Sequence, residues 1–448
     1  MPKSPYFFSK IVPASDWAGV VAFCAHVLFF VDMFFTMFQG IFFIKNTFAG
    51  YVKTIHKTYR FACAPTKKQE MLLNRHFGCV RWVYNHFLHE RVEQYTVTKK
   101  SDNYYKQAAT LTRLKKQEET GWLKEVNSQT LQRALRNLDT AFVNFFRGNA
   151  KFPRFKSKRE KNSFTVPQFV EVVDGKVYFP KFKDGIKLIE HRDIKGEVKH
   201  CTISKTPTGN FFVSILCEVK HEQLKPTKKQ VGIDLGIKDF AVTSDGCRFK
   251  NNYYLNRYER QLKKAQRHLS RKQKGSRSRN RQRLKVAVIH EKIANTRLDL
   301  LHKVSTQITK EYDIICVEDL NVKGMMANHK LAKHIADASW GTFVRLLEYK
   351  AGWNDKQVVK INRFYPSSKT CNQCGYIHQD LRLSERMWTC PNGHVLDRDI
   401  NASKNILDQG LKIMGAELSH YTDGGLHKTS ETKHKPEKSE AHKSLACG

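Results

Sequence analysis

The sequence predicts an α/β protein of several domains, and three observations lead to this prediction. The chain has 448 residues, which is enough to bury more than one hydrophobic core. Short alternating runs from Phe169 to Val219, separated by Gly and Pro turns, predict a small antiparallel barrel. The continuous apolar run Ile314–Val317 predicts a strand buried on both faces, which is typical of a parallel sheet covered by helices.

The region before the barrel strands predicts one strand and a helical insertion. The alternating segment 54–65 is a candidate strand, and Thr66 with Gln69 predicts a helix start just after it. A second helix is expected over 128–146, where Leu131, Leu135, Leu138 and Phe142 share one face. We expect the early strand to join the barrel, so that residues 52–65 and 163–225 form one domain and residues 66–162 form a helical domain with a basic connector.

The net charge of +36 favours binding to a polyanion such as nucleic acid. One cluster of charge lies in the connector, where Phe152, Phe155 and Phe164 alternate with basic residues in a pattern suited to a nucleic-acid backbone and exposed bases. The alternative is a solvated linker whose Phe side chains fill nearby cores. The candidate contact residues are Lys151, Arg154, Lys156, Lys158 and Arg159, with Lys161 beside them.

A second cluster of charge extends from Asn256 to Lys285, with thirteen Lys and Arg residues and the single acid Glu259. Such a run is often a solvated helix face, but these charges would repel one another without a polyanion, so phosphate contact is the preferred interpretation. A helix is expected from Val286 to Lys310. The candidate contact residues in this cluster are Arg267, Arg271, Lys272, Arg277, Arg279, Arg281 and Arg283.

The first 51 residues differ from the rest because segment 17–44 is apolar and rich in Phe. A membrane anchor and a buried element are both possible, since about 20 apolar residues span a bilayer. We favour a misplaced start, with the functional chain beginning near Val52 and needing no membrane. Most of the eleven cysteines are isolated in apolar surroundings, which indicates a reducing, cytoplasmic location.

Three acidic side chains from distant segments are candidates for divalent-ion binding. Asp234 interrupts an apolar strand, Glu318 follows the buried run, and Asp397 or Asp399 begins a helix. Carboxylates gathered from separate segments suit Mg²⁺ or Mn²⁺, and two such ions support phosphodiester hydrolysis. Each acid alone has an ordinary alternative, because a turn, an ion pair with Lys or a helix N-cap would explain it equally well. Together they predict a metal-dependent nuclease.

Several motifs resemble the TnpB family, the transposon-encoded relatives of type V CRISPR effectors. "VGIDLGIKDFAVTSDG", "ICVEDLN", "FYPSSKTCNQCG" and "DRDINASKNIL" are similar to its three RuvC segments and its zinc insertion, and "FGCVRWVYNHFL" resembles its N-terminal half. The resemblance extends from about Val52 to Gly415. It implies an RNase H-like (RuvC) nuclease fold with a zinc-knuckle insertion, beside a wedge-type β-barrel that contains the helical insertion.

The resemblance also implies a function, an RNA-guided DNA endonuclease of a transposable element. A guide RNA from the transposon end would pair with the target strand of double-stranded DNA. The protein would act as a monomeric ribonucleoprotein near the nucleoid. By motif position, Asp234, Glu318 and Asp399 would be the catalytic acids, and Asp397 would cap the helix or orient Arg398.

The zinc insertion departs from the family pattern, because the second Cys-x-x-Cys pair has only one cysteine. Cys371 and Cys374 are followed by Cys390 in "CPNGH", and His394 is the residue best placed to complete a Cys₃His site. His378 is a second candidate, and a loop without metal is the alternative. The remaining domains implied are a nuclease core over 228–365, the insertion over 366–396, a last nuclease segment over 397–415 and a disordered tail over 416–448.

Two other functions are compatible with this sequence. A DNA transposase or resolvase acting without RNA would use the same acids. A non-catalytic regulator would use only the basic surface, although the intact set of three acids argues against it.

Overall fold

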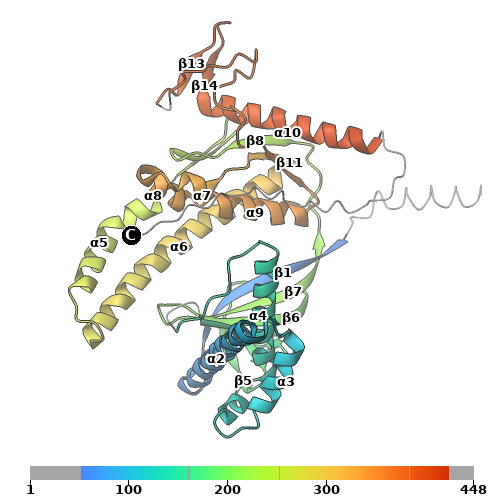
Figure 1. The fold of residues 1–448 in the computed structure, drawn as a ribbon. Helices are drawn as coiled ribbons and strands as arrows, with labels where there is room; N and C mark the ends of the chain where they lie inside the picture. Colours follow the sequence, from blue (N-terminus) through green and yellow to red (C-terminus); the bar gives the residue numbers. More distant parts are fainter. Residues whose placement is uncertain (1–51, 159–161, 252, 383, 423–448) are drawn as a thin grey trace, which may run out of the picture. The chain divides into compact units, whose positions relative to one another are not determined.

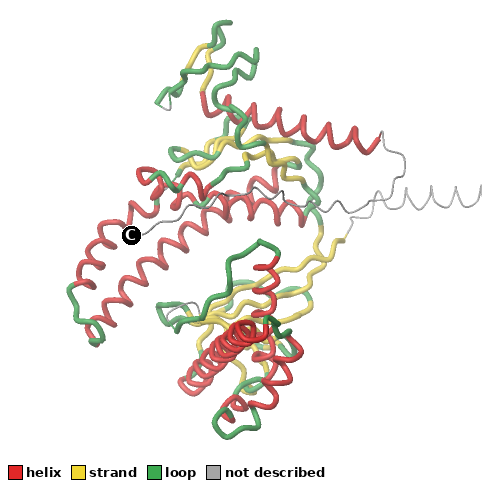
Figure 2. The backbone as a smooth tube through the Cα atoms, in the orientation of Figure 1, coloured by secondary structure: helices red, strands yellow, loops and turns green. Residues whose placement is uncertain are grey.

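The computed structural model describes residues 52–158, 162–251, 253–382 and 384–422 (Figures 1 and 2). The predicted extension 1–51 and the residues Arg159 and Lys161 lie outside the described residues. The chain divides into two units: the first ends at Lys225 and also includes Gln261–Lys292, and the second comprises Pro226–Arg260 and the chain from Ile293 onward. Both units combine helices with sheets, which confirms the predicted α/β class.

The first unit contains a seven-stranded antiparallel sheet with the order β2-β6-β7-β1-β5-β4-β3. The early strand β1 (Val52–Ala64) pairs with β7 (Phe211–Glu222) from Val52 to Cys63, so it joins the later strands across the helical insertion as expected. Closure of this sheet into a barrel stays a prediction. The other strands are β2 (Asn162–Val166), β3 (Glu171–Val173), β4 (Lys176–Phe179), β5 (Phe182–Ile189) and β6 (Glu197–Lys205).

The helical insertion begins with α2 (Lys67–Thr98), and its predicted start is confirmed by a reciprocal capping box between Thr66 and Gln69. The helix α4 (Ser128–Phe146) spans the segment expected from the sequence and buries Leu131, Leu135, Leu138 and Phe142. Between them lie α3 (Tyr104–Leu114) and the 3-10 helix η1 (Gly121–Glu125).

The second unit contains a five-stranded mixed sheet with the order β10-β9-β8-β11-β12. Strands β8, β9 and β10 pair antiparallel, whereas β11 pairs parallel with both β8 and β12. Ile315, Cys316 and Val317 are fully buried, which confirms the strand predicted over 314–317. The bounds are β8 (Gln230–Asp234), β9 (Asp239–Thr243), β10 (Arg248–Lys250), β11 (Ile314–Glu318) and β12 (Gln357–Ile361).

Two long helices, α5 (Tyr254–Ser270) and α6 (Arg277–Glu311), follow one another in a hairpin (Figure 1). We predicted a helix from Val286 to Lys310. Its predicted start is wrong, because α6 already begins at Arg277. The Ser276 hydroxyl accepts the Arg279 N–H at 3.1 Å, a local N-cap that the charge pattern obscured. The shorter helices α7 (Val322–Met325), α8 (His329–Ala338) and α9 (Trp340–Trp353) come after β11.

The last helix, α10 (Arg398–Thr422), packs directly on the mixed sheet. At Gly232 in β8 an added Cβ would lie 2.0 Å from the Ser403 carbonyl oxygen, and at Gly410 in α10 it would lie 2.3 Å from Cys316 Sγ. At both positions only glycine permits such close packing of the helix on the sheet. This packing fixes the start of α10 beside the end of β8. The helix continues to Thr422, so the disordered tail predicted over 416–448 is wrong for residues 416–422, and residues 423–448 lie outside the described residues.

A short hairpin, β13 (Met387–Thr389) and β14 (Val395–Asp397), precedes α10. It has its own small core of Leu381, Trp388 and Leu396 together with buried cysteines. Within the part of the chain that the structure describes, we find no helix both long and apolar enough to cross a bilayer. The apolar segment 17–44 lies outside that part.

Candidate active site and metal centre

Two of the predicted acids end neighbouring parallel strands. Asp234 is the last residue of β8 and Glu318 the last residue of β11. The residues just before them, Ile233 and Val317, are direct partners in the parallel ladder. Because parallel strands end at the same edge of a sheet, both carboxylates emerge at one place.

The third acid comes from the start of α10. Asp397 accepts the backbone N–H groups of Asp399 and Ile400 through Oδ1, at 3.1 and 3.0 Å. Its predicted role as a helix cap is thereby confirmed. Asp399 lies in the first turn of α10, where the helix meets β8. Of Asp397 and Asp399, it is therefore the acid that lies beside Asp234 and has no capping role.

The surroundings of Asp234 shift its pKa. Asp234 is partly buried at the end of β8. This desolvation, together with the negative charges of Glu318 and Asp399, raises the pKa of Asp234 to about 7. Burial also raises the pKa of Glu318. Neighbouring carboxylates repel one another when they are ionised, and a bound cation would offset this repulsion.

Arginine side chains compensate part of this negative charge. Arg386 donates to both oxygens of Asp399, at 2.9 and 3.3 Å. Arg248 forms ion pairs with Asp239 at 3.0 Å, with Asp397 at 2.8 Å and with Asp399 at 3.6 Å. Sequence reasoning missed both arginines, because nothing in their local sequence places them against acids nine or more residues away.

The spacing of the three acids limits how they could hold metal. Among the described residues, the one group of three or more Cys, His, Asp or Glu with ligand atoms all within 4.8 Å of one another does not include them. Two oxygens bound to the same Mg²⁺ lie at most about 4.2 Å apart, twice the Mg–O distance. In this arrangement the three acids are therefore too far apart for all of them to bind one Mg²⁺ ion.

A network from α10 supports Glu318. The Ser367 hydroxyl donates to Glu318 Oε1 at 2.6 Å. Asn405, buried in α10, donates to the carbonyl oxygens of Ser367 and Thr370 at 2.7 and 2.6 Å, and Asn401 donates to Thr370 at 2.7 Å. The sequence signal for these residues was two Asn side chains four positions apart on the packed face of a helix. On the same helix, Ala402 and Ile406 are the fully buried apolar residues among those described.

The group that does meet the 4.8 Å spacing is Cys371, Cys374, Cys390 and His394. Cys374 Sγ lies 3.7 Å from Cys390 Sγ, and His394 Nδ1 lies 3.6 Å from Cys371 Sγ and 3.2 Å from Cys390 Sγ. Tetrahedral zinc with its usual bond lengths requires about 3.8 Å between sulfurs and about 3.6 Å between sulfur and nitrogen. The donor set and its spacing fit zinc.

Two tight turns shape this group. The Gly375 N–H donates to the Cys371 carbonyl at 2.9 Å, and the Gly393 N–H donates to the Cys390 carbonyl at 2.9 Å. Both glycines have positive φ. The rival candidate His378 instead packs edge-on against Trp388, with ring centres 5.6 Å apart, and is not in the group.

Comparison with known proteins identifies the family. Three family models match: "Probable transposase" over residues 214–329, "Cas12f1-like, TNB domain" over 340–406 and "Helix-turn-helix domain" over 55–100. A Streptomyces pristinaespiralis protein named "Putative RNA-guided DNA endonuclease" is 39% identical over 80% of this chain and 90% of its own length. This chain belongs to the TnpB family. Escherichia coli "Putative RNA-guided DNA endonuclease InsQ" is 32% identical over 80% of this chain and 93% of its own. A mimivirus protein named "TnpB-like protein L770" is 27% identical over 62% of this chain and 56% of its own.

The matched helix-turn-helix region has a different structure in this TnpB-family chain. Residues 55–100 comprise most of β1 and the single long helix α2. The name of the family model therefore does not describe these elements.

The basic connector of this TnpB-family protein is largely exposed. Lys151, Arg154 and Lys158 are exposed, while Lys156 is half-buried with its Nζ 3.8 Å from the ring centre of Tyr84. Of the three interleaved aromatics, Phe152 and Phe155 are exposed, whereas Phe164 is buried in the core against Phe77. Phe164 thus follows the alternative interpretation, in which connector Phe side chains fill a core.

In the helical hairpin, one predicted contact residue has an internal role. Arg279 donates to the carbonyl oxygens of Leu269 and Lys272, both at 2.8 Å, and so holds the turn between α5 and α6. The other predicted contact residues of the hairpin are exposed: Arg267, Arg271, Lys272, Arg277, Arg281 and Arg283.

Proposed function

We propose that this protein is an RNA-guided DNA endonuclease of a transposable element, which hydrolyses phosphodiester bonds with divalent metal. The observation that supports this most is the meeting of Asp234 and Glu318 at the ends of β8 and β11, with Asp399 near enough to raise the pKa of Asp234. The named activity of the TnpB relatives is consistent with it.

The strand order supports an RNase H-like core. Three antiparallel strands, β8 to β10, continue into the parallel strands β11 and β12. The predicted nuclease core over 228–365, the insertion over 366–396 and the last segment over 397–415 are proposed as its domains. The wedge-type barrel over 52–65 and 163–225, with the helical domain over 66–162, is proposed for binding the guide.

Asp234, Glu318 and Asp399 would hold Mg²⁺ or Mn²⁺. When bound, a pair of such ions would activate the attacking water and stabilise the leaving oxygen. Ser367 would fix one oxygen of Glu318 so that the other faces the metal. Arg386 and Arg248 would keep the site compact through Asp399 before the ions bind, and would attract the phosphate of the DNA.

Cys371, Cys374, Cys390 and His394 would hold a structural zinc ion. Because the Asn372 N–H donates to Asn401 in α10 at 2.9 Å, the zinc loop and the helix that bears Asp399 are linked. Zinc would therefore stabilise the position of the third acid as well as its own loop.

The guide RNA and the double-stranded DNA target would bind the connector and the exposed basic residues of α5 and α6. The candidates are Lys151, Arg154, Lys156, Lys158, Arg267, Arg271, Lys272, Arg277, Arg281 and Arg283. We propose a monomeric ribonucleoprotein that acts at the nucleoid. A transposase acting without RNA is the second candidate, because one matching family model is described as "Probable transposase".

Purification of the full chain tests this proposal. We expect a co-purifying RNA of discrete length, and cleavage of DNA that matches it. Asp234→Ala should abolish cleavage and leave RNA binding within about two-fold, because only the metal site changes. RNA-free protein that still cuts or joins DNA would favour the transposase, and RNA binding without cleavage by the unaltered protein would favour a regulator.

A further inference from the structure

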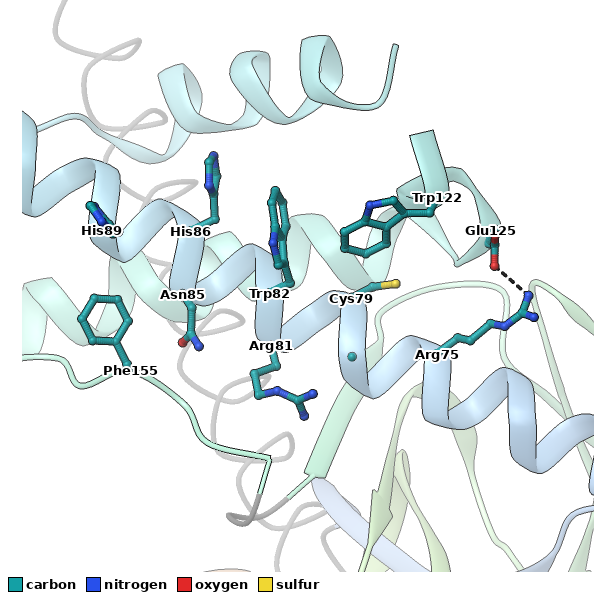
Figure 3. A pocket seen from close by; sticks show the side chains of 11 residues that line it. Arg75, Cys79, Arg81, Trp82, Asn85, His86, His89, Trp122, Glu125 and Phe155 are labelled. Atoms are coloured by element: carbon teal, nitrogen blue, oxygen red, sulfur yellow. Dashed lines mark hydrogen bonds and ion pairs between the residues drawn. The ribbon is translucent and has the colours of Figure 1, made fainter. Parts of the chain in front are cut away.

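A hollow of about 790 Å³ lies along one face of α2. We call it the α2 cleft and define it by Trp82, His86, Trp122, Phe155, Arg75 and Arg81 (Figure 3). Its size is within the range of small-ligand sites, roughly 300–1,000 Å³. None of these residues belongs to the candidate nuclease site or to the zinc group.

Flat aromatic rings stand side by side in the cleft (Figure 3). Trp82 and His86, one helical turn apart, are nearly parallel, with ring centres 4.6 Å apart and 8° between their planes. Trp122 meets Trp82 edge-on at 5.3 Å. The Trp122 Nε1–H donates to the Glu119 carbonyl at 3.0 Å, which fixes the orientation of the indole.

These rings are not needed to fill a core. The opposite face of α2 buries Leu73, Phe77, Val83 and Phe87, whereas Trp122 is 38% exposed and Phe155 is 56% exposed. Exposed aromatic faces cost free energy in water unless a ligand covers them, and a nucleobase covers such a face by stacking.

The surroundings of the cleft are cationic. Arg81 and Arg75 line it, although Arg75 also pairs with Glu125 at 2.7 Å. Asn85 binds the backbone of Lys156 twice, donating to its carbonyl at 2.9 Å and accepting its N–H at 2.7 Å. The basic connector is thereby held along α2, and it brings Phe155 and the exposed Arg154 to the rim.

Gly78 leaves room at the floor of the cleft. A Cβ at this position would meet no atom within 4 Å, and the backbone there is ordinary helix. A larger residue would therefore fit the helix without strain and would fill part of the cleft that Gly78 lines. This feature provides a test that leaves every aromatic side chain in place.

We propose that the α2 cleft binds an unpaired nucleotide of a single strand, with its base stacked on the exposed face of Trp122 and its phosphate near Arg81 and the connector. The inference deepens the proposed function, because it assigns one nucleotide site to a protein proposed to bind RNA and DNA. Base stacking and a phosphate contact are common to both nucleic acids, so the experiment must distinguish them.

The test uses the full chain stripped of bound nucleic acid, with eight-residue strands of uridine or deoxyuridine that contain one photoreactive 5-iodouracil. At about 0.3 M salt, non-specific phosphate contacts are weak and stacking persists. We expect crosslinks to peptides that contain Trp82, Trp122 or Phe155. The strand that crosslinks more efficiently identifies the source as RNA or DNA.

Three variants make the result specific to the cleft. Gly78→Leu and Trp122→Ala should each weaken binding about 5- to 100-fold, the effect expected for loss of one stacked base. Trp122→Phe should retain most of the affinity. Tyr95→Ala, which removes an exposed ring from the same helix outside the cleft, should have no effect. Thermal melting of Gly78→Leu at the wild-type temperature would show that its fold is intact.

The proposal is overturned if crosslinks map elsewhere, if neither strand crosslinks, or if folded Gly78→Leu binds as tightly as the unaltered chain. Asp234→Ala should crosslink in the cleft like the unaltered protein. A failure of the nuclease proposal would therefore leave this result unchanged, and a failure of the cleft proposal would leave cleavage chemistry untouched.

Discussion

The Ser367 hydroxyl donates a hydrogen bond of 2.6 Å to Glu318 Oε1, which ties the segment before the zinc group to the end of a central strand. Ser367 is buried, and its own carbonyl oxygen is held by Asn405 from α10. Three elements distant in the chain therefore fix the position of one carboxylate.

Ser367→Ala removes the hydroxyl group that donates to Glu318. We expect the Mg²⁺ concentration for half-maximal DNA cleavage to rise, or the rate to fall, by about 10-fold or more, as for other residues that orient metal ligands. Titration of Mg²⁺ in a cleavage assay measures this. Ser368→Ala, one residue further on, is the matched control and should behave like the unaltered protein. Equal effects of both substitutions would show that Ser367 acts only through the fold of the loop.

The zinc group predicts a specific pattern of rescue at residue 394. His394→Cys offers a thiolate in place of Nδ1 and should retain one equivalent of zinc, because Cys₄ and Cys₃His sets are both common. His394→Ala should lose zinc and melt at a lower temperature. Metal analysis after gel filtration provides the measurement. His378→Ala serves as the control, since His378 packs on Trp388, and full zinc content in His394→Ala would contradict the assigned ligand set.

Arg279 and Arg281 are expected to differ although both belong to the same charge run. Arg279→Gln should lower the melting temperature, because the Leu269 and Lys272 carbonyl oxygens lose their donor. Arg281 is exposed, so Arg281→Gln should leave stability unchanged. If Arg281 contacts a phosphate, its loss should reduce the slope of log affinity for RNA against log salt by about 0.7 to 0.9.

The unaltered protein supplies the reference for that experiment. Raising the salt concentration from 50 to 200 mM should weaken RNA binding on the order of 10³-fold if six or more phosphates are contacted. A flat response to salt would contradict the phosphate-binding role of α5 and α6, whatever the behaviour of the single variants.

The parts of this molecule that local sequence determines were predictable. Thr66 and Gln69 mark the start of α2 within four residues of one another, and the apolar run around Cys316 defines a buried strand. The acids at the ends of β8 and β11 stand out because carboxylates rarely follow buried strands without a reason. His394 could be proposed because it lies four residues after Cys390.

Contacts made by tertiary folding were not predictable in the same way. Arg248 reaches Asp397 across 149 positions, and Asn405 reaches Ser367 across 38. The α2 cleft joins Trp82 to Trp122 and Phe155, whose separation in the chain shows no periodicity. For Phe164 the local pattern indicated exposure, and packing against Phe77 determined the opposite.

The buried side chain of His76 should make the stability of the first unit depend on pH. It is fully buried between Phe164 and Phe182, and its Nε2 accepts the Asn127 N–H at 3.1 Å. Burial, and to a smaller extent the charge of Lys181, lowers the pKa of His76 to about 4 from its ordinary value of 6.5. The unfolded chain therefore binds a proton more readily than the folded chain between these two pH values.

The contribution of neutral His76 to the free energy of unfolding should consequently be fully present above about pH 6.5. It should be lost as the pH falls toward 4, by up to roughly 1.4 kcal/mol for each pH unit. His76→Gln keeps an acceptor for the Asn127 N–H without a titrating group, so its stability should change less over this range. Urea unfolding of both proteins at pH 7.5 and pH 5 measures the difference, and loss of zinc at low pH affects both equally. His86→Gln, a half-exposed position on the same helix, is the control. If the unaltered protein and His76→Gln lose the same stability between these pH values, the buried imidazole is not the group that responds to acid.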